Sequence, residues 1–153
     1  MLAVVSMALV SCGGGKDVKK DVKDEGLKPA DPVITYGSID YNSKTDVRDC
    51  INVKNVVIRE NGMYEVSITA QVELLKEPSE PIKEIRSGVE LLDKNGARIC
   101  GISNLAFFFE GLEKVGDVSS ESCTLDTDML ASKVIEEAKF YRIINVYGLK
   151  KSK

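Results

Sequence analysis

The residues of this sequence best able to do covalent chemistry are its four cysteines, Cys12, Cys50, Cys100 and Cys123. A cysteine becomes a nucleophile or a metal ligand with help from a neighbouring base, a positive charge or a second thiol. Histidine is absent, and no two cysteines form a C-x-x-C pair. The sequence therefore predicts no catalytic cysteine and no metal site, and it has no phosphate-binding loop or dinucleotide fingerprint that would indicate a cofactor.

Cys12 differs from the other cysteines because it lies where an apolar run, residues 1–10, gives way to polar sequence. The tetrad Leu9-Val10-Ser11-Cys12 resembles the lipobox of bacterial lipoproteins. The resemblance implies that residues 1–11 are a signal peptide and that Cys12 carries a thioether-linked diacylglycerol, usually with a further acyl chain such as palmitate. Two or more acyl chains anchor a protein stably, so we expect a lipid-anchored protein of the outer membrane. The alternative is that residues 1–10 form a buried N-terminal element of the domain.

No Lys or Arg precedes the apolar run, although a signal peptide normally begins with basic residues. Either this signal is unusual, or the natural start lies upstream of Met1. Residues 12–32 then contain three consecutive glycines, mixed charges and two prolines, a composition that predicts a disordered linker. Within it, Lys16-Asp17 loosely resembles the surface-sorting signal of some Bacteroidetes lipoproteins. The domain is therefore expected either at the cell surface or facing the periplasm.

Residues 33–150 have the pattern of a mainly β domain. Apolar and polar residues alternate most clearly over 64–74, which predicts a half-buried antiparallel strand with Tyr64 on its core face. Asn61-Gly62 and Asn95-Gly96 predict tight hairpin turns, and a bulge is expected near Asn55. A single short helix is expected at 129–138, and strands are expected at 33–41, 50–58, 64–74, 85–92, 97–102, 106–109, 118–125 and 140–149.

Three segments of this domain, residues 64–74, 88–99 and 112–117, resemble Ig-like modules of the FxLYD kind. Those modules contain a "Leu-Tyr-Asp-x-x-Gly-x" hairpin and a "Leu-x-Pro-Gly-Glu" turn. Here Leu92-Asp93 and Val115-Gly116-Asp117 stand at the corresponding places. The resemblance implies an Ig-like antiparallel β-sandwich that acts as an interaction or spacer domain in the envelope, with no shared catalytic residues to transfer.

Phe107, Phe108 and Phe109 are three consecutive aromatic residues of the domain. Alternate residues of a strand face opposite sides, so at least one face of this triplet should lie in the core. The other face is a candidate surface for a partner. Cys100 and Cys123 are candidates for a cross-strand or inter-sheet disulfide, and the alternative is that both are small buried thiols.

Asp126 and Asp128, with Asp117, have oxygen ligands of the kind that bind Ca²⁺, but helix capping by Thr127 or Asp128 explains the pair without a metal. The net charge of −3 argues against nucleic acid as a partner. We therefore expect a non-enzymatic envelope protein, attached to the membrane through Cys12, that binds another protein or a polymer. A hydrolase that uses carboxylates alone and a purely structural spacer are the alternatives.

Overall fold

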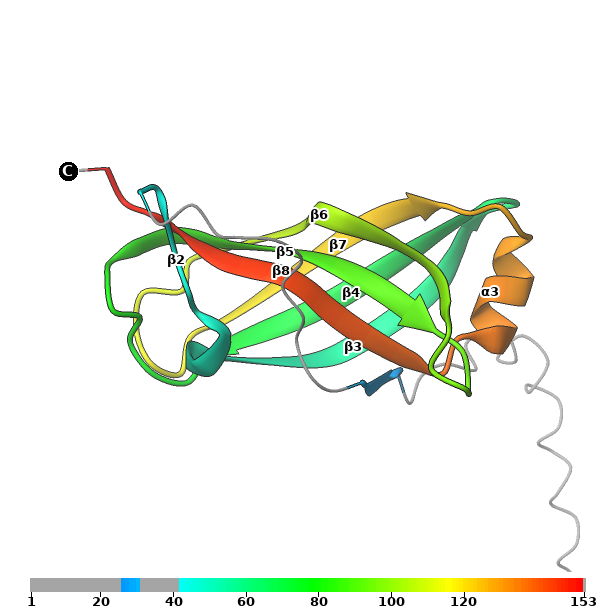
Figure 1. The fold of residues 1–153 in the computed structure, drawn as a ribbon, viewed down its shortest axis with the longest axis horizontal. Coiled ribbons are helices and arrows are strands. Elements are labelled where there is room, and N and C mark those ends of the chain that lie inside the picture. Colours follow the sequence, from blue (N-terminus) through cyan, green and yellow to red (C-terminus); the bar gives the residue numbers. More distant parts are fainter. Residues whose placement is uncertain (1–25, 31–41, 153) are drawn as a thin grey trace, which may run out of the picture.

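The computed structural model describes residues 26–30 and 42–152, which form a sandwich of two β-sheets (Figure 1). The prediction of a mainly β fold, with one short helix before the last strand, is confirmed. The described helical elements are a 3-10 turn, η2 (Arg48–Cys50), and one α-helix, α3 (Ala131–Glu137). The strands are β1 (Lys28–Pro29), β2 (Lys44–Thr45), β3 (Ile51–Gly62), β4 (Glu65–Leu74), β5 (Ile82–Leu92), β6 (Arg98–Glu110), β7 (Val118–Asp126) and β8 (Phe140–Lys150).

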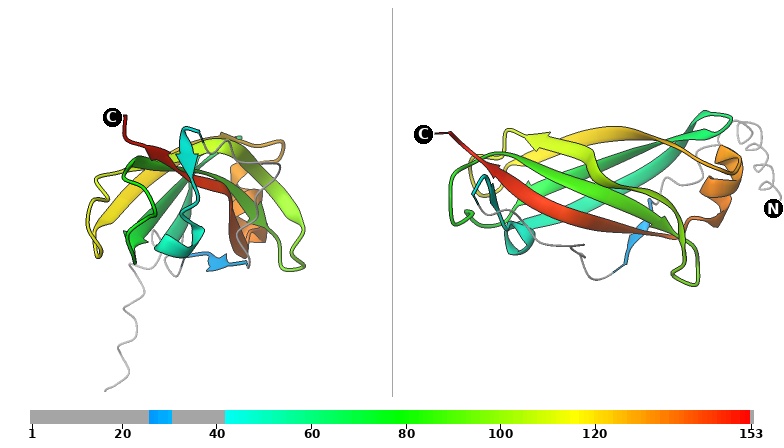
Figure 2. Two further views of the ribbon diagram at one scale, coloured as in Figure 1. Left: turned by 60° about the vertical axis from the view of Figure 1, so that its left-hand side comes forward. Right: turned by 45° about the horizontal axis from the view of Figure 1, so that its top comes forward.

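The first sheet has the strand order β1-β8-β5-β6, with β2 also paired to β8, and the second has the order β3-β4-β7. All pairs are antiparallel except β1 with β8. Figure 2 shows the two sheets as separate layers, with α3 at one end of the elongated sandwich. The space between the layers is the hydrophobic core.

Strand β4 shows how the sequence builds this core. Every second residue from Val66 to Leu74 is at most 1% exposed, while the residues between them are half-buried on the outer side. Successive side chains of a strand point to opposite faces, so this alternation places one whole face of β4 between the sheets. Burial of these apolar side chains is the main stabilising contribution to the sandwich.

The turn between β3 and β4 lies two residues later than predicted. We expected Asn61-Gly62 at its centre, but the turn consists of Met63 and Tyr64. The carbonyl oxygens of Met63 and Tyr64 accept hydrogen bonds of 2.8 Å from the backbone N–H groups of Ala131 and Thr127. These bonds hold the turn against the segment before α3, and Tyr64 is therefore 52% exposed instead of lying on the core face.

Strand β6 unites two strands that we predicted separately, 97–102 and 106–109. Its register against β5 shifts between Ser87 and Val89, so the β6 residues opposite this point form a bulge. The polar residues that suggested a break in the pattern belong to this bulge. The bulge predicted near Asn55 of β3 is confirmed, and Asn55 has a φ of 53°.

Helix α3 is shorter than the predicted 129–138. It begins after Leu130, and no side chain caps its N-terminus. Thr127 instead donates its hydroxyl hydrogen to the carbonyl oxygen of Met129 at 2.6 Å. The prediction of a cap at Thr127 or Asp128 is therefore wrong, because the backbone before α3 is bonded to the β3–β4 turn.

Residues 26–30 belong to the domain, although we assigned them to the linker. β1 pairs with β8 of the first sheet, and the backbone N–H of Leu27 donates to the carbonyl oxygen of Val56, on β3 of the second sheet, at 2.9 Å. Leu27 is only 7% exposed and joins the core. Gly26 has a φ of +75°, and a Cβ there would lie 2.9 Å from the Val56 oxygen, so this entry into the domain needs glycine.

The direction of β1 fixes the side from which the chain reaches the domain. Because β1 runs parallel to β8, and β8 begins shortly after α3 ends, the chain enters β1 from the α3 end. The signal peptide at 1–11, Cys12, the linker up to residue 25 and the strand at 33–41 lie outside the described residues and stay predictions.

Candidate functional site

The triplet of phenylalanines divides between the two faces of β6. Phe107 and Phe109 are 0% and 1% exposed, and their ring centroids lie 5.4 Å apart in the core. Phe108 points to the outer face of the first sheet and is 39% exposed. Two members of the triplet are therefore core residues, and the candidate partner surface reduces to Phe108.

Phe108 is one end of a row of side chains that crosses the first sheet. Arg86 of β5 lies in register with Phe108 on one side and with Tyr147 of β8 on the other. The guanidinium carbon of Arg86 is 5.1 Å from the Phe108 ring centroid, and Nζ of Lys44 on β2 is 4.3 Å from the Tyr147 ring centroid. Each such cation–π contact contributes about 0.5–1 kcal/mol at an exposed site. The Phe108 row is thus an alternation of cation and ring over adjacent strands, made of Lys44, Tyr147, Arg86 and Phe108.

A buried carboxylate holds the centre of the Phe108 row in place. Glu84, which is 5% exposed, accepts a hydrogen bond from Arg86 and forms an ion pair with it. Burial opposes the charged guanidinium, but the hydrogen bonds with Glu84 and Tyr147 outweigh burial and raise the pKa of Arg86 above its ordinary value. Arg86 is therefore a permanently charged group whose orientation is set by its neighbours.

A second buried carboxylate lies farther along the same strand. Glu90 is 6% exposed, and its two carboxylate oxygens lie 3.4 Å from Nε of Arg98 and 3.5 Å from Nη1 of Arg142. Glu84 and Glu90 are separated by about 20 Å, given the rise of a strand. The paired carboxylates of glycoside hydrolases lie about 5–10 Å apart. Glu84 and Glu90 therefore form ion pairs with different arginines, and they lie too far apart to act together as the two carboxylates of a glycoside hydrolase.

The three described cysteines are free thiols. Cys100 on β6 and Cys123 on β7 are half-buried against the core, and burial raises the pKa of each to about 11. The predicted disulfide between them is not formed in the structure, and both side chains pack as small apolar groups. Cys50 is buried, with its Sγ 3.9 Å from the carbonyl oxygen of Glu77, and burial raises its pKa as well. The three cysteines are therefore almost entirely in the protonated, unreactive thiol form near neutral pH.

The three aspartates considered for Ca²⁺ do not meet. Asp117 lies beside the end of β4, whereas Asp126 lies opposite its beginning. Asp117 accepts two hydrogen bonds, of 2.7 and 2.8 Å, from backbone N–H groups of its own turn, and these bonds lower its pKa. Asp126 and Asp128 line a pocket of about 180 Å³, but Arg98 lines it too. No group of three or more Cys, Asp or Glu side chains in the described ranges is arranged to hold a metal ion.

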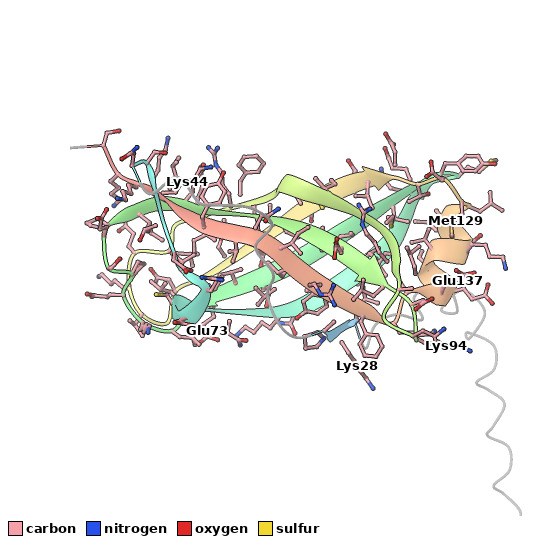
Figure 3. All side chains as sticks on the ribbon, viewed as in Figure 1. Lys28, Lys44, Glu73, Lys94, Met129 and Glu137 are labelled. Carbon is pink, nitrogen blue, oxygen red and sulfur yellow. The ribbon has the colours of Figure 1, made fainter. Side chains whose placement is uncertain are left out.

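Exposed apolar side chains gather at both ends of the sandwich, and neither group was predicted as a site. The α3-end patch consists of Met63, Tyr64 and Leu130, which are 71%, 52% and 42% exposed. Backbone hydrogen bonds between the β3–β4 turn and the segment before α3 bring these residues together. Figure 3 marks this end by the labels of Met129 and Glu137. The opposite end carries a second exposed group, made of Leu75, Val115 and Val118.

Comparison of the chain with protein-family models, curated proteins and solved structures gives no match. Within the part of the chain that the structure describes, no helix is both long and apolar enough to span a bilayer. The candidate site therefore rests on geometry alone, and its centre is the Phe108 row.

Proposed function

We propose that this protein is a lipid-anchored protein of the outer membrane whose β-sandwich is a non-catalytic interaction domain. The anchor is supported by the Leu9-Val10-Ser11-Cys12 tetrad and by the polar, glycine-rich sequence that follows it. The binding role is supported by the Phe108 row. The partner is another protein or a polymer of the envelope, on the periplasmic or the outer side of the membrane.

The observation that carries the binding role is the exposed ring of Phe108 beside the fixed guanidinium of Arg86. Aromatic residues and arginine are enriched among the residues that dominate binding energy at interfaces. Because Glu84 and Tyr147 already orient Arg86, a partner loses little of its binding energy to ordering that side chain. The row is also continuous over four adjacent strands, which suits contact with an extended surface.

A hydrolase is a weaker proposal for this domain. A hydrolase that uses carboxylates for general acid–base catalysis needs two of them close together in one cavity. Glu84 and Glu90, the two buried carboxylates of the described residues, are each engaged by arginine and lie far apart. A purely structural spacer has no need of an ordered cation–aromatic row. Crosslinking of partners beside the Phe108 row distinguishes a spacer from a binding domain.

The anchor is tested by Cys12→Ser in cells. We expect the variant to accumulate as an unprocessed precursor of slower migration and to leave the membrane fraction. Metabolic labelling with a radioactive fatty acid should mark the wild type and not the variant. Unchanged migration, fractionation and labelling would refute the anchor.

The interaction surface is tested by Phe108→Ala in the anchored protein, with Val115→Ala as a matched control. Both residues are exposed and apolar, but Val115 lies at the end of the sandwich away from α3. Partners are captured in living cells by a photo-crosslinker placed at Glu110, which is exposed, lies two residues from Phe108 on the same strand and is not a member of the row. We expect Phe108→Ala to remove the crosslinked band and Val115→Ala to retain it. A wild type without any crosslinked band would favour the spacer.

A further inference from the structure

We infer that the α3-end patch docks on the lipid surface that carries Cys12, so that the sandwich stands upright with its opposite end directed away from the membrane. This inference rests on the proposed lipid anchor and adds an orientation to it. The occupant of the patch is the phospholipid interface itself. Three independent features of the described residues lead to it.

The first feature is the composition and shape of the patch. Met63 is 71% exposed at the tip of the β3–β4 turn, and Leu130 is 42% exposed beside it. The ring of Tyr64 adds an apolar body with a polar hydroxyl, a combination that favours the boundary between lipid and water. Backbone hydrogen bonds of 2.8 Å tie the turn to the segment before α3, so these side chains project from one rigid end.

The second feature is the route of the chain. Because β1 runs parallel to β8, residue 26 lies on the α3 side of β1, and the predicted linker approaches the domain from that side. A flexible coil with the length of the predicted linker, from Cys12 to residue 26, has a root-mean-square reach of about 20 Å. A tether of this length keeps the nearer end of the domain at high effective concentration at the membrane. The nearer end carries the α3-end patch, and the group around Val115 lies at the far end.

The third feature is the charge beside the patch. Asp126, Asp128 and Glu60 are exposed within four residues of the patch in the chain, and Glu136 and Glu137 are exposed on α3. These acidic groups outnumber Arg59 and Lys133, the exposed basic groups of the same segments. Negative groups are repelled by anionic headgroups and tolerated by zwitterionic ones. The patch therefore fits a zwitterionic phospholipid surface, and anionic lipid should weaken its docking.

The chain contains no tryptophan, so one substitution introduces a single fluorescent reporter of depth. We would compare Met63→Trp with Val115→Trp in the full lipidated protein, because both positions are exposed and lie at opposite ends. Each variant is reconstituted into phosphatidylcholine vesicles, with or without bromine atoms on the acyl chains. Flotation of the protein with the vesicles tests the lipid anchor, and quenching by bromine tests the orientation of the domain.

We expect both variants to float with the vesicles, and brominated lipid to quench the fluorescence of Met63→Trp and not that of Val115→Trp. Added phosphatidylglycerol should reduce the quenching of Met63→Trp. Flotation without quenching of Met63→Trp, or stronger quenching of Val115→Trp, would overturn the orientation and leave the anchor intact. A protein that does not float would overturn both. A blue shift of Met63→Trp that grows with protein density, without quenching by bromine, would identify a second copy as the occupant and also overturn the inference.

Discussion

Replacing Leu27 by alanine should destabilise the whole domain, although this residue lies in sequence that looks like a linker. Leu27 is 7% exposed and belongs to the core cluster. Leucine-to-alanine substitutions in cores cost about 2–5 kcal/mol, and the lower end applies here because a residue beside a two-residue strand is enclosed less completely. We therefore expect a loss of about 2 kcal/mol. For a domain of this size, that loss lowers Tm by about 8 °C.

The assay is urea and thermal unfolding, followed by circular dichroism, of a chain that begins at Gly13. The control is Lys28→Ala, because Lys28 is the exposed neighbour of Leu27, and its replacement should change stability by less than about 0.5 kcal/mol. Equal unfolding midpoints for Leu27→Ala and Lys28→Ala would refute the argument that β1 is part of the cooperative fold. A fall in Tm for Leu27→Ala alone would support it.

Three further predictions concern the core and the buried thiols. Gly148→Ala should destabilise the domain by about 1–3 kcal/mol in urea, since overpacking forces neighbours to move, and the new Cβ would lie 2.7 Å from a side-chain carbon of β5. Phe107→Ala should cost about 3–5 kcal/mol, whereas Phe108→Ala should cost about 1 kcal/mol, the size of its cation–π contact; similar losses for both would contradict the assignment of faces. Stability should fall as the pH rises from 9.0 towards 11, because the thiols of Cys100 and Cys123 keep their protons up to a pKa of about 11 in the folded state and ionise at their ordinary pKa of 9.0 in the unfolded state. Replacing both cysteines by alanine should make that fall shallower, and an unchanged slope would argue against their burial.

Much of the fold follows from local pattern. The alternation over 64–74 predicts a strand with one buried face, and β4 occupies all of this range except Tyr64. Asn95-Gly96 predicts the β5–β6 turn for a local reason as well, and the carboxylate of Asp93 stabilises this turn by accepting hydrogen bonds from the backbone N–H groups of Asn95 and Ala97. Such features involve neighbours in the chain, and they are visible without a structure.

What could not be predicted depends on contacts between distant segments. Tyr64 was misplaced because the β3–β4 turn bonds to residues before α3, which no local pattern shows. Leu27 was missed because a single apolar residue among charges has no periodicity. In the candidate site, the division of the phenylalanine triplet was predictable from alternation, but the Phe108 row was not. Its cations come from β2 and β5, and only the registers bring Lys44 and Arg86 to the same face.

The parallel pairing of β1 with β8 has a mechanical consequence. A pull on the anchor is directed along β1, out past the α3 end, so it loads the contacts of β1 in shear and does not unzip them one by one. Because β1 is already extended along the direction of the pull, its release adds little length, and its contacts with β8 and β3 must break together. The five residues that join the tether to the sandwich thus resist a pull on the anchor as one unit, through backbone contacts with both sheets.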